Sequence, residues 1–313
     1  MTSLVLNDKT SQSFVRIVGG RRDEDLVGVA DFNSSNLKQK TDIKPFLDGL
    51  GLKPREVAVI KADVERAVRT GKEPTEPVAA AVYKEVCAAP ADPARSLEVH
   101  DGHFQPVFGA DMSTNRIAYI FGASGCGKST ATRKLTDDWR KHYKKAPIYI
   151  FSRFNGDSDE ALKIKGADFI SEEDMDTHLV ANGSAIKCAD LTTPCLCIFD
   201  DYDAFGKKAY ESCAETLKDI LECGRKLGVC AIITSHLAVD KTKPILRTVW
   251  NEAHLIGLFP SASQGRLAQY PLECYAGLDK KQIQKMLKLP SRWVFIKKTY
   301  PQAVASQNEI YLL

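Results

Sequence analysis

The stretch that most constrains the fold is residues 122–129, Gly-Ala-Ser-Gly-Cys-Gly-Lys-Ser, which match the phosphate-loop (Walker A) pattern G-x-x-x-x-G-K-[ST]. An apolar, β-prone run, Ile117–Phe121, precedes it, and residues 130–143 favour a helix. A strand, a glycine loop and a helix in this order predict backbone N–H groups that point into the loop, together with the positive end of the helix. The sequence therefore predicts a loop that binds nucleotide phosphates.

Two side chains of this loop have the chemistry that a nucleoside triphosphate requires. Lys128 is expected to reach the β- and γ-phosphates of ATP, and the Ser129 hydroxyl is expected to bind Mg²⁺. The residues expected to surround the nucleotide are Gly122, Ala123, Ser124, Gly125, Cys126, Gly127, Lys128, Ser129 and Thr130. ATP and Mg²⁺ are accordingly the predicted substrate and cofactor.

A second anchor is the buried-strand pattern of residues 196–199, which ends in two acidic residues, as a Walker B strand does. Asp200 is expected to hold the Mg²⁺ shell, and Asp201 is expected to polarise the attacking water. Asp203 is a competitor for either role. A strand-end acid can also simply cap a turn, so the catalytic interpretation depends on the phosphate loop earlier in the chain.

A third strand, Val229–Ile233, leads into Thr234-Ser235-His236. A polar residue at the tip of such a strand would lie next to the γ-phosphate. Ser235 and His236 are therefore both candidate γ-phosphate sensors that would contact the nucleotide, and plain turn residues are the alternative.

The remaining landmarks concern the organisation of the chain. The fold class is predicted to be α/β, with a central sheet flanked by helices. A Pro- and Ala-rich linker at residues 89–93 divides the chain into a small α+β domain at residues 1–92 and a P-loop domain at residues 93–313. The C-terminal tail reads as a closing β-pair, and Arg292, Lys297 and Lys298 are expected to give it a basic face.

Bulk properties set limits on partners and compartment. A net charge of +3 is too mild to predict nucleic-acid binding by itself. The nine cysteines include no C-x-x-C pair, which favours a reducing compartment over a disulfide framework. We find no signal-peptide pattern and no apolar stretch that approaches 18 residues, so we expect no transmembrane segment.

The order of these motifs, together with Gly224-Arg225-Lys226 after the second anchor and the Arg-Trp…Tyr-Pro tail, resembles a known group over residues 97–313. The group comprises the genome-packaging ATPases of large nucleocytoplasmic DNA viruses and their smaller relatives, in the FtsK–HerA superfamily. The family has Gly-Arg-His where this chain has Gly224-Arg225-Lys226, and a glutamine-type residue at its sensor strand.

This resemblance implies a RecA-like core and a homo-oligomeric ring, expected to be a hexamer, with ATP at the subunit interfaces. It implies that Arg225 is an arginine finger and, with Asp201 and Lys128, a catalytic residue. It further implies sequence-independent binding of double-stranded DNA, a capsid or internal-membrane protein as partner, and a location in the virion, the host cytoplasm or the virus factory.

The predicted function is an ATPase motor that translocates double-stranded viral DNA into a preformed capsid. Two alternatives stay open. One is a P-loop ATPase that drives the secretion of protein or conjugative DNA. The other is a virion assembly protein that binds nucleotide but has no motor activity.

Overall fold

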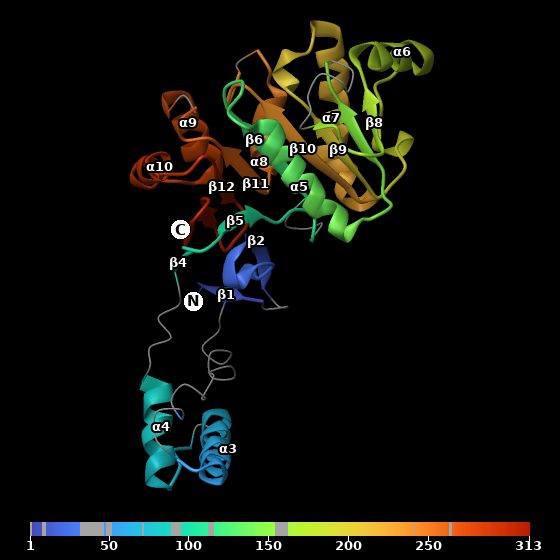
Figure 1. Cartoon of the computed structure of the whole chain (residues 1–313). Helices are drawn as coiled ribbons and strands as arrows, with labels where there is room; N and C mark the ends of the chain where they lie inside the picture. Colours follow the sequence, from blue (N-terminus) through green and yellow to red (C-terminus); the bar gives the residue numbers. More distant parts are fainter. Residues whose placement is uncertain are drawn as a thin grey trace.

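The structure is a computed structural model, and it describes residues 2–7, 11–31, 47, 52–70, 72–88, 95–111, 116–153, 162–240, 242–262 and 265–313. Within these ranges a ten-stranded mixed sheet has the order β4-β14-β13-β12-β11-β6-β10-β9-β7-β8 (Figure 1). Its strands are β4 (Ser96–Glu98), β6 (Ile117–Phe121), β7 (Ile148–Phe151), β8 (Ala167–Ile170), β9 (Cys195–Phe199), β10 (Val229–Ser235), β11 (Leu255–Leu258), β12 (Val294–Lys297), β13 (Ala303–Ala305) and β14 (Glu309–Leu312).

The half of the sheet from β11 to β8 is parallel, whereas β12, β13, β14 and β4 add antiparallel strands at one side. Strand β10 lies between β6 and β9, with Ser235 opposite Phe121 and Ile233 opposite Phe199. The carboxyl ends of parallel strands meet at one edge of a sheet. The segments that follow β6, β9 and β10 therefore converge there.

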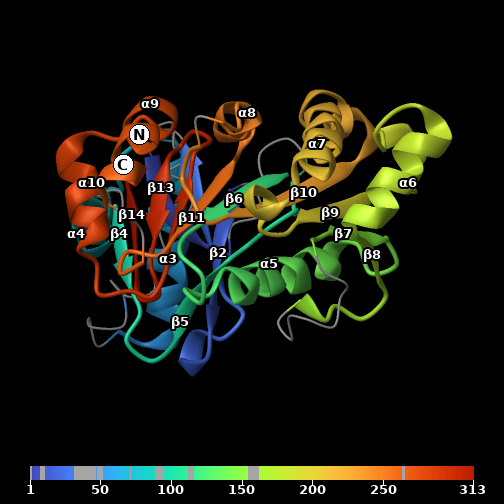
Figure 2. The ribbon, with the colours of Figure 1, turned by 90° about the horizontal axis from the view of Figure 1, so that it is seen from above.

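Helices cover both faces of the sheet (Figure 2). Helix α5 (Lys128–His142) packs on one face with Ala118 and Ile120 of β6. The opposite face, with Tyr119 and Phe121, packs with the other helices. They are α6 (Glu172–Asn182), α7 (Lys207–Leu227), α8 (Ile245–Glu252), α9 (Gly265–Ala276) and α10 (Lys280–Leu287). The predicted α/β class, with a central sheet flanked by helices, is confirmed.

A second, antiparallel sheet has the order β1-β3-β2-β5. Its strands are β1 (Thr2–Leu6), β2 (Gln12–Val18), β3 (Leu26–Asp31) and β5 (His103–Pro106), and β2 and β3 are joined through the 3₁₀ turn η1 (Gly20–Arg22). Phe14 and Ile17 of β2 share a core with Trp139 of α5. The guanidinium of Arg16 donates to Asp138 Oδ1 of α5 at 2.6 Å, so this sheet is fixed to the helix that follows the phosphate loop.

Helices α3 (Pro54–Thr70) and α4 (Pro77–Ala88) pack on each other around a separate small core that includes Ile60, Val64 and Val82. The predicted boundary between residues 92 and 93 lies outside the described residues. The division into two domains stays a prediction. Of the residues before the predicted boundary, strands β1–β3 pack against α5, whereas α3 and α4 pack around a core of their own. No helix in the part of the chain that the structure describes is long and apolar enough to span a membrane.

Candidate functional site

The phosphate loop joins the buried strand β6 to the start of α5. Gly125 and Gly127 have φ values of 74° and 113°, a left-handed backbone region that favours glycine. The N–H of Gly122 donates to Ser235 O at 3.1 Å, which fixes the base of the loop to the end of β10. Helix α5 begins at Lys128, so its first N–H groups lie at the loop as the sequence predicts.

Lys128 connects the loop to the end of β9. Its side chain is buried, and its Nζ donates to Gly122 O at 3.0 Å and lies 3.3 Å from Asp201 Oδ1. Ser129 follows half-buried in the first turn of α5, and Thr130 is exposed. The buried ammonium thus already faces two oxygens at the mouth of the loop, an arrangement that suits the binding of phosphate oxygens.

Asp200 and Asp201 are both held by one hydroxyl that the sequence analysis did not single out. Thr234 Oγ1 donates to Asp200 Oδ1 at 3.2 Å and accepts from the N–H of Asp201 at 2.7 Å. Asp201 has a φ of 41°, a left-handed conformation in which Asp and Asn are favoured among side chains other than glycine. Thr234 therefore sets the positions of both acids.

Strand alternation could have identified Thr234. Cys230 and Ile232 of β10 pack on the α5 face, and Ala231 and Ile233 pack on the opposite face. By the same alternation, Thr234 lies on the α5 face and Ser235 lies on the opposite face. The Ser235 side chain is buried, and its hydroxyl donates to Leu237 O at 2.9 Å rather than to a group of the phosphate loop.

His236 lies between two carboxylates. Its Nε2 is 3.5 Å from Asp201 Oδ2, and its Nδ1 is 3.3 Å from Asp203 Oδ1. The backbone N–H of His236 also donates to the Asp203 carboxylate at 3.0 Å. Among the predicted site residues, Lys128, Asp200, Asp201 and His236 thus come together at the edge where β6, β9 and β10 end.

Arg225 is not part of this cluster within one chain. Helix α7 runs from Lys207, near the Asp200–Asp201 edge, to Leu227 before β10, and Arg225 lies about 27 Å along it at 1.5 Å per residue. The Arg225 side chain is exposed. The buried arginine at this end is Arg116, which donates to Ile220 O at 3.1 Å and Val229 O at 3.3 Å and ties α7 to β10.

The basic face predicted for the C-terminal tail is wrong for Lys297. Its side chain is buried, and Nζ donates to Thr299 O at 2.7 Å and Pro301 O at 2.9 Å. Lys298 is half-buried and donates to Trp250 O and Asn251 O. Burial lowers the pKa of each lysine to about 8. Both ammonium groups bind carbonyls of their own chain, and only Arg292 is exposed.

The metal-binding potential of the site depends on oxygen donors. Among the described residues, no cluster of three or more His, Cys, Asp or Glu side chains could hold a metal ion. The Ser129 hydroxyl and the Asp200 carboxylate are hard oxygen donors of the type that Mg²⁺ uses together with substrate phosphates and water. The donor set thus fits a Mg²⁺ ion that arrives with a nucleotide.

Comparisons with known proteins place the chain in a viral family. No protein-family model matches it. The uncharacterized protein V3 of the Sputnik virophage is 34% identical over 215 residues, which are 68% of this chain and 82% of that protein. The chain belongs to the family of protein V3. The viral source of this relative agrees with the viral origin that the motif order indicates.

Solved structures with a similar arrangement are more distant from this V3-family member. The genome-packaging NTPase B204 of Sulfolobus turreted icosahedral virus 2, in complex with AMPPCP, is 16% identical with a TM-score of 0.41, over 63% of this chain and 96% of that one. The conjugation coupling protein TcpA of pCW3 is 10% identical with a TM-score of 0.43, over 94% and 76%. The type VII secretion ATPase EccC of Thermomonospora curvata is 12% identical with a TM-score of 0.43, over 68% and 28%. Likeness at this level carries no conclusion on function, which has to be argued from the residues of the chain.

Proposed function

We propose that the chain is an ATP-hydrolysing motor that moves double-stranded viral DNA into a preformed capsid. The observation that carries the ATPase part is the convergence of three strand ends. Lys128 Nζ lies 3.3 Å from Asp201 Oδ1, and Asp201 Oδ2 lies 3.5 Å from His236 Nε2. A lysine at the phosphate loop and a carboxylate that can polarise water are groups that hydrolysis of a γ-phosphate uses, and the imidazole beside that carboxylate can contact the same phosphate.

In this proposal the loop N–H groups and Lys128 bind the β- and γ-phosphates of ATP. Ser129 and Asp200 would hold Mg²⁺, which when bound neutralises charge on these phosphates. The Thr234 hydroxyl, which donates to Asp200 at 3.2 Å, keeps that carboxylate oriented toward the loop edge. Nucleotide binding would draw Lys128 from Asp201 to the phosphates, because both are anions that compete for one ammonium.

Asp201, once released from Lys128, would orient and polarise the attacking water. His236 contacts the other oxygen of that carboxylate and is itself held by Asp203. Of the two candidate sensors, His236 is therefore the one that we assign to the γ-phosphate, since the Ser235 hydroxyl is bound to Leu237 O.

Arg225 would complete the site of a neighbouring subunit. Its exposed position at the far end of α7 suits contact with another copy of the chain. An arginine supplied in trans stabilises transition-state charge, an effect of about 10³–10⁵ in rate. A ring of subunits, with a hexamer as the working model, would follow from such head-to-tail contacts.

The remaining parts of the proposed function are the transported DNA, the docking partner and the location. DNA would be held through its phosphates, so binding would be salt-sensitive and indifferent to sequence. A capsid or internal-membrane protein would dock the motor, in the virion or in the virus factory of the host cytoplasm. The viral family and the motif order support this part.

The test is the steady-state rate of ATP hydrolysis with and without linear duplex DNA. We expect DNA to raise the rate several-fold, Lys128→Ala to abolish it, and Lys145→Ala, at an exposed lysine just after α5, to leave it unchanged. A rate that duplex DNA does not alter would contradict DNA packaging and favour a secretion motor. ATP binding without turnover would favour an assembly protein.

A further inference from the structure

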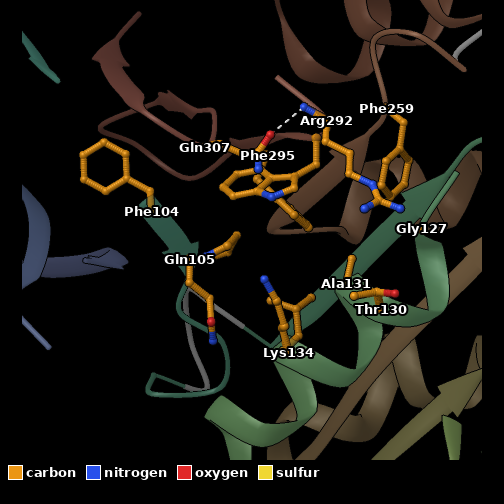
Figure 3. Close-up of a pocket in the computed structure, with 13 residues that line it drawn as sticks. Phe104, Gln105, Gly127, Thr130, Ala131, Lys134, Phe259, Arg292, Phe295 and Gln307 are labelled. Atoms are coloured by element: carbon orange, nitrogen blue, oxygen red, sulfur yellow. Dashed lines mark hydrogen bonds between the residues drawn. The ribbon is translucent and has the colours of Figure 1, made fainter. Parts of the chain in front are cut away.

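A cavity of about 110 Å³ opens beside Gly127 of the phosphate loop, and Asp201 does not line it (Figure 3). Its walls come from α5, from β5, from the residue that follows β11, and from the C-terminal tail. The residues used below are Gln105, Lys134, Phe259, Arg292, Trp293 and Gln307. None of them belongs to the proposed hydrolytic cluster.

The cavity is continuous with the phosphate loop. Gly127, Thr130, Ala131 and Lys134 line it, and their spacing places them on one face of the first turns of α5. Lys128 does not line the cavity and instead contacts Gly122 and Asp201. A nucleotide with its phosphates in the loop would thus have its sugar and base next to this cavity.

Aromatic side chains form its deep part. Phe259 and Trp293 are both buried, at 2% and 9% exposure, and the Trp293 indole packs on Phe295 at 5.3 Å between ring centroids. The Arg292 guanidinium extends along Phe259 toward the loop, and its Nε lies 3.7 Å from the position that a Gly127 Cβ would occupy (Figure 3). One positive charge therefore lies at the junction of the aromatic wall and the phosphate loop.

Hydrogen bonds hold the tail side of the cavity in place. The Gln307 side chain accepts from the N–H of Arg292 at 2.8 Å, and Gln307 O accepts from the N–H of Phe104 at 2.7 Å. The N–H of Gln307 in turn donates to Ser291 Oγ at 3.0 Å. These bonds connect the tail to β5, so the aromatic wall is formed before any ligand enters.

We propose that this cavity binds the purine base of the nucleotide and makes the site selective for ATP and GTP. The inference rests on the proposed nucleotide binding at the loop. A volume of about 110 Å³ is of the order that holds one small ring compound and excludes a polymer. A purine presents a larger π-face than a pyrimidine for stacking on an aromatic side chain, and the half-buried Gln105 amide and Lys134 ammonium supply donors for ring nitrogens and oxygens.

The test compares the binding of ATP, GTP, CTP, UTP and inorganic tripolyphosphate to the full chain with Mg²⁺. We expect ATP and GTP to bind about tenfold or more tightly than tripolyphosphate, because stacking of one base on an aromatic side chain is worth this much. CTP and UTP should bind more weakly than ATP and GTP, because a pyrimidine ring covers less of the aromatic wall than a purine does. Trp293→Ala should weaken ATP binding about tenfold and leave tripolyphosphate binding unchanged. Tyr300→Ala, at an exposed aromatic residue of the same tail outside the cavity, is the matched control and should change neither.

A fluorescence measurement covers the case in which Trp293→Ala does not fold. The chain has three tryptophans, and the two others, Trp139 and Trp250, do not line the cavity. ATP should quench the emission of the wild type, tripolyphosphate should not, and Trp293→Phe should lose the quenching. Quenching that survives in Trp293→Phe would overturn the proposal.

Two outcomes separate this inference from the proposed function. If tripolyphosphate and all four nucleotides bind with equal affinity, the loop binds phosphate and only the base site is wrong. If the wild type binds neither tripolyphosphate nor ATP, the nucleotide function itself fails. Equal weakening of ATP and tripolyphosphate by Trp293→Ala would also contradict a base-specific contact.

Discussion

At the scale of single residues, Asp201 has the most constrained environment of the proposed site. Its backbone is left-handed with a φ of 41°, and its N–H is held by Thr234 at 2.7 Å. One carboxylate oxygen faces Lys128 and the other faces His236. The backbone turn therefore aims this carboxylate into the space between the phosphate loop and β10.

Replacing Asp201 with Asn tests its proposed role in turnover. Asn tolerates the left-handed backbone, so the fold should persist. We expect ATP binding to be retained and the rate of hydrolysis to fall about 10²–10⁴-fold, because the amide cannot polarise water as a carboxylate does. Asp168→Asn, at an exposed position on β8, is the control and should keep full activity. Unchanged turnover in Asp201→Asn would remove Asp201 from the mechanism.

Lys297 gives a prediction on pH. Burial lowers its pKa to about 8 from an ordinary 10.5, so between these values the unfolded chain binds more protons than the folded chain. The contribution of Lys297 to stability should therefore rise as the pH rises through this window. We expect the unfolding free energy of the wild type to increase relative to that of Lys297→Met as the pH rises from about 7.5 to about 10. A difference that stays constant over this pH range would contradict the prediction.

The sequence predicted residues of this site where a motif or the tip of a strand marks them. Lys128 and the Asp200–Asp201 pair follow from local patterns. Thr234 and Arg116 were missed because their importance comes from partners far along the chain, Asp200 in one case and Ile220 in the other. Lys297 was misjudged because a charge pattern does not show that the Thr299 and Pro301 carbonyls surround the ammonium.

At the scale of elements, the contact between β2 and α5 determines how the N-terminal sheet is attached. Asp138 is fully buried and accepts from Arg16 at 2.6 Å and from the N–H of Phe108 at 2.8 Å. Arg16 also lies 3.2 Å from Glu24. Since α5 begins at the phosphate loop, this ion pair connects the first sheet to the nucleotide site through one rigid helix.

Asp138→Ala should therefore destabilise the protein strongly. Removing the Asp138 carboxylate leaves the buried Arg16 charge with only the exposed Glu24 as partner and the N–H of Phe108 without its acceptor, a loss of about 3–5 kcal/mol in unfolding free energy. Asp137→Ala is the matched control, because Asp137 is the neighbouring residue and its pair with Arg133 is exposed. That change should cost less than about 1 kcal/mol. Denaturant unfolding of both variants checks the prediction, and similar losses would show that the Arg16–Asp138 pair has no special weight.

Local patterns predicted the parallel strands but not their order. The apolar runs of β6, β9 and β10 mark them as buried strands. Strand β10 lies between β6 and β9, and this position brings Thr234 to Asp200. The position depends on which strands pair, and long-range packing decides the pairing. The sequence predicted a closing β-pair in the C-terminal tail, where the structure has the three antiparallel strands β12, β13 and β14. It did not predict that β12 pairs with β11.

At the scale of the whole molecule, neither Arg225 nor Arg292 brings its charge to the cluster of Lys128, Asp201 and His236 within one chain. Arg292 lies at the proposed base cavity, and Arg225 lies at the far end of α7. A subunit interface that brings the Arg225 of one copy to the loop of the next would supply that charge. In the proposed arrangement, hydrolysis would be a property of the assembly rather than of the single chain.

Mixing two inactive variants tests this arrangement. Arg225→Ala subunits keep an intact loop, and Lys128→Ala subunits keep an intact Arg225. Each variant alone should lose hydrolysis, and their mixture should recover part of it at interfaces that combine the two intact groups. Absence of recovery, with mixed assembly verified by co-purification of differently tagged subunits, would assign Arg225 a structural role within its own chain.

In the proposed function, ATP hydrolysis moves the protein along duplex DNA. Displacement of a third-strand oligonucleotide from a linear duplex measures this movement directly. We predict displacement with ATP and Mg²⁺, none with a non-hydrolysable ATP analogue, and none with Asp201→Asn. Steady ATP hydrolysis on duplex DNA without displacement of the third strand would contradict the account.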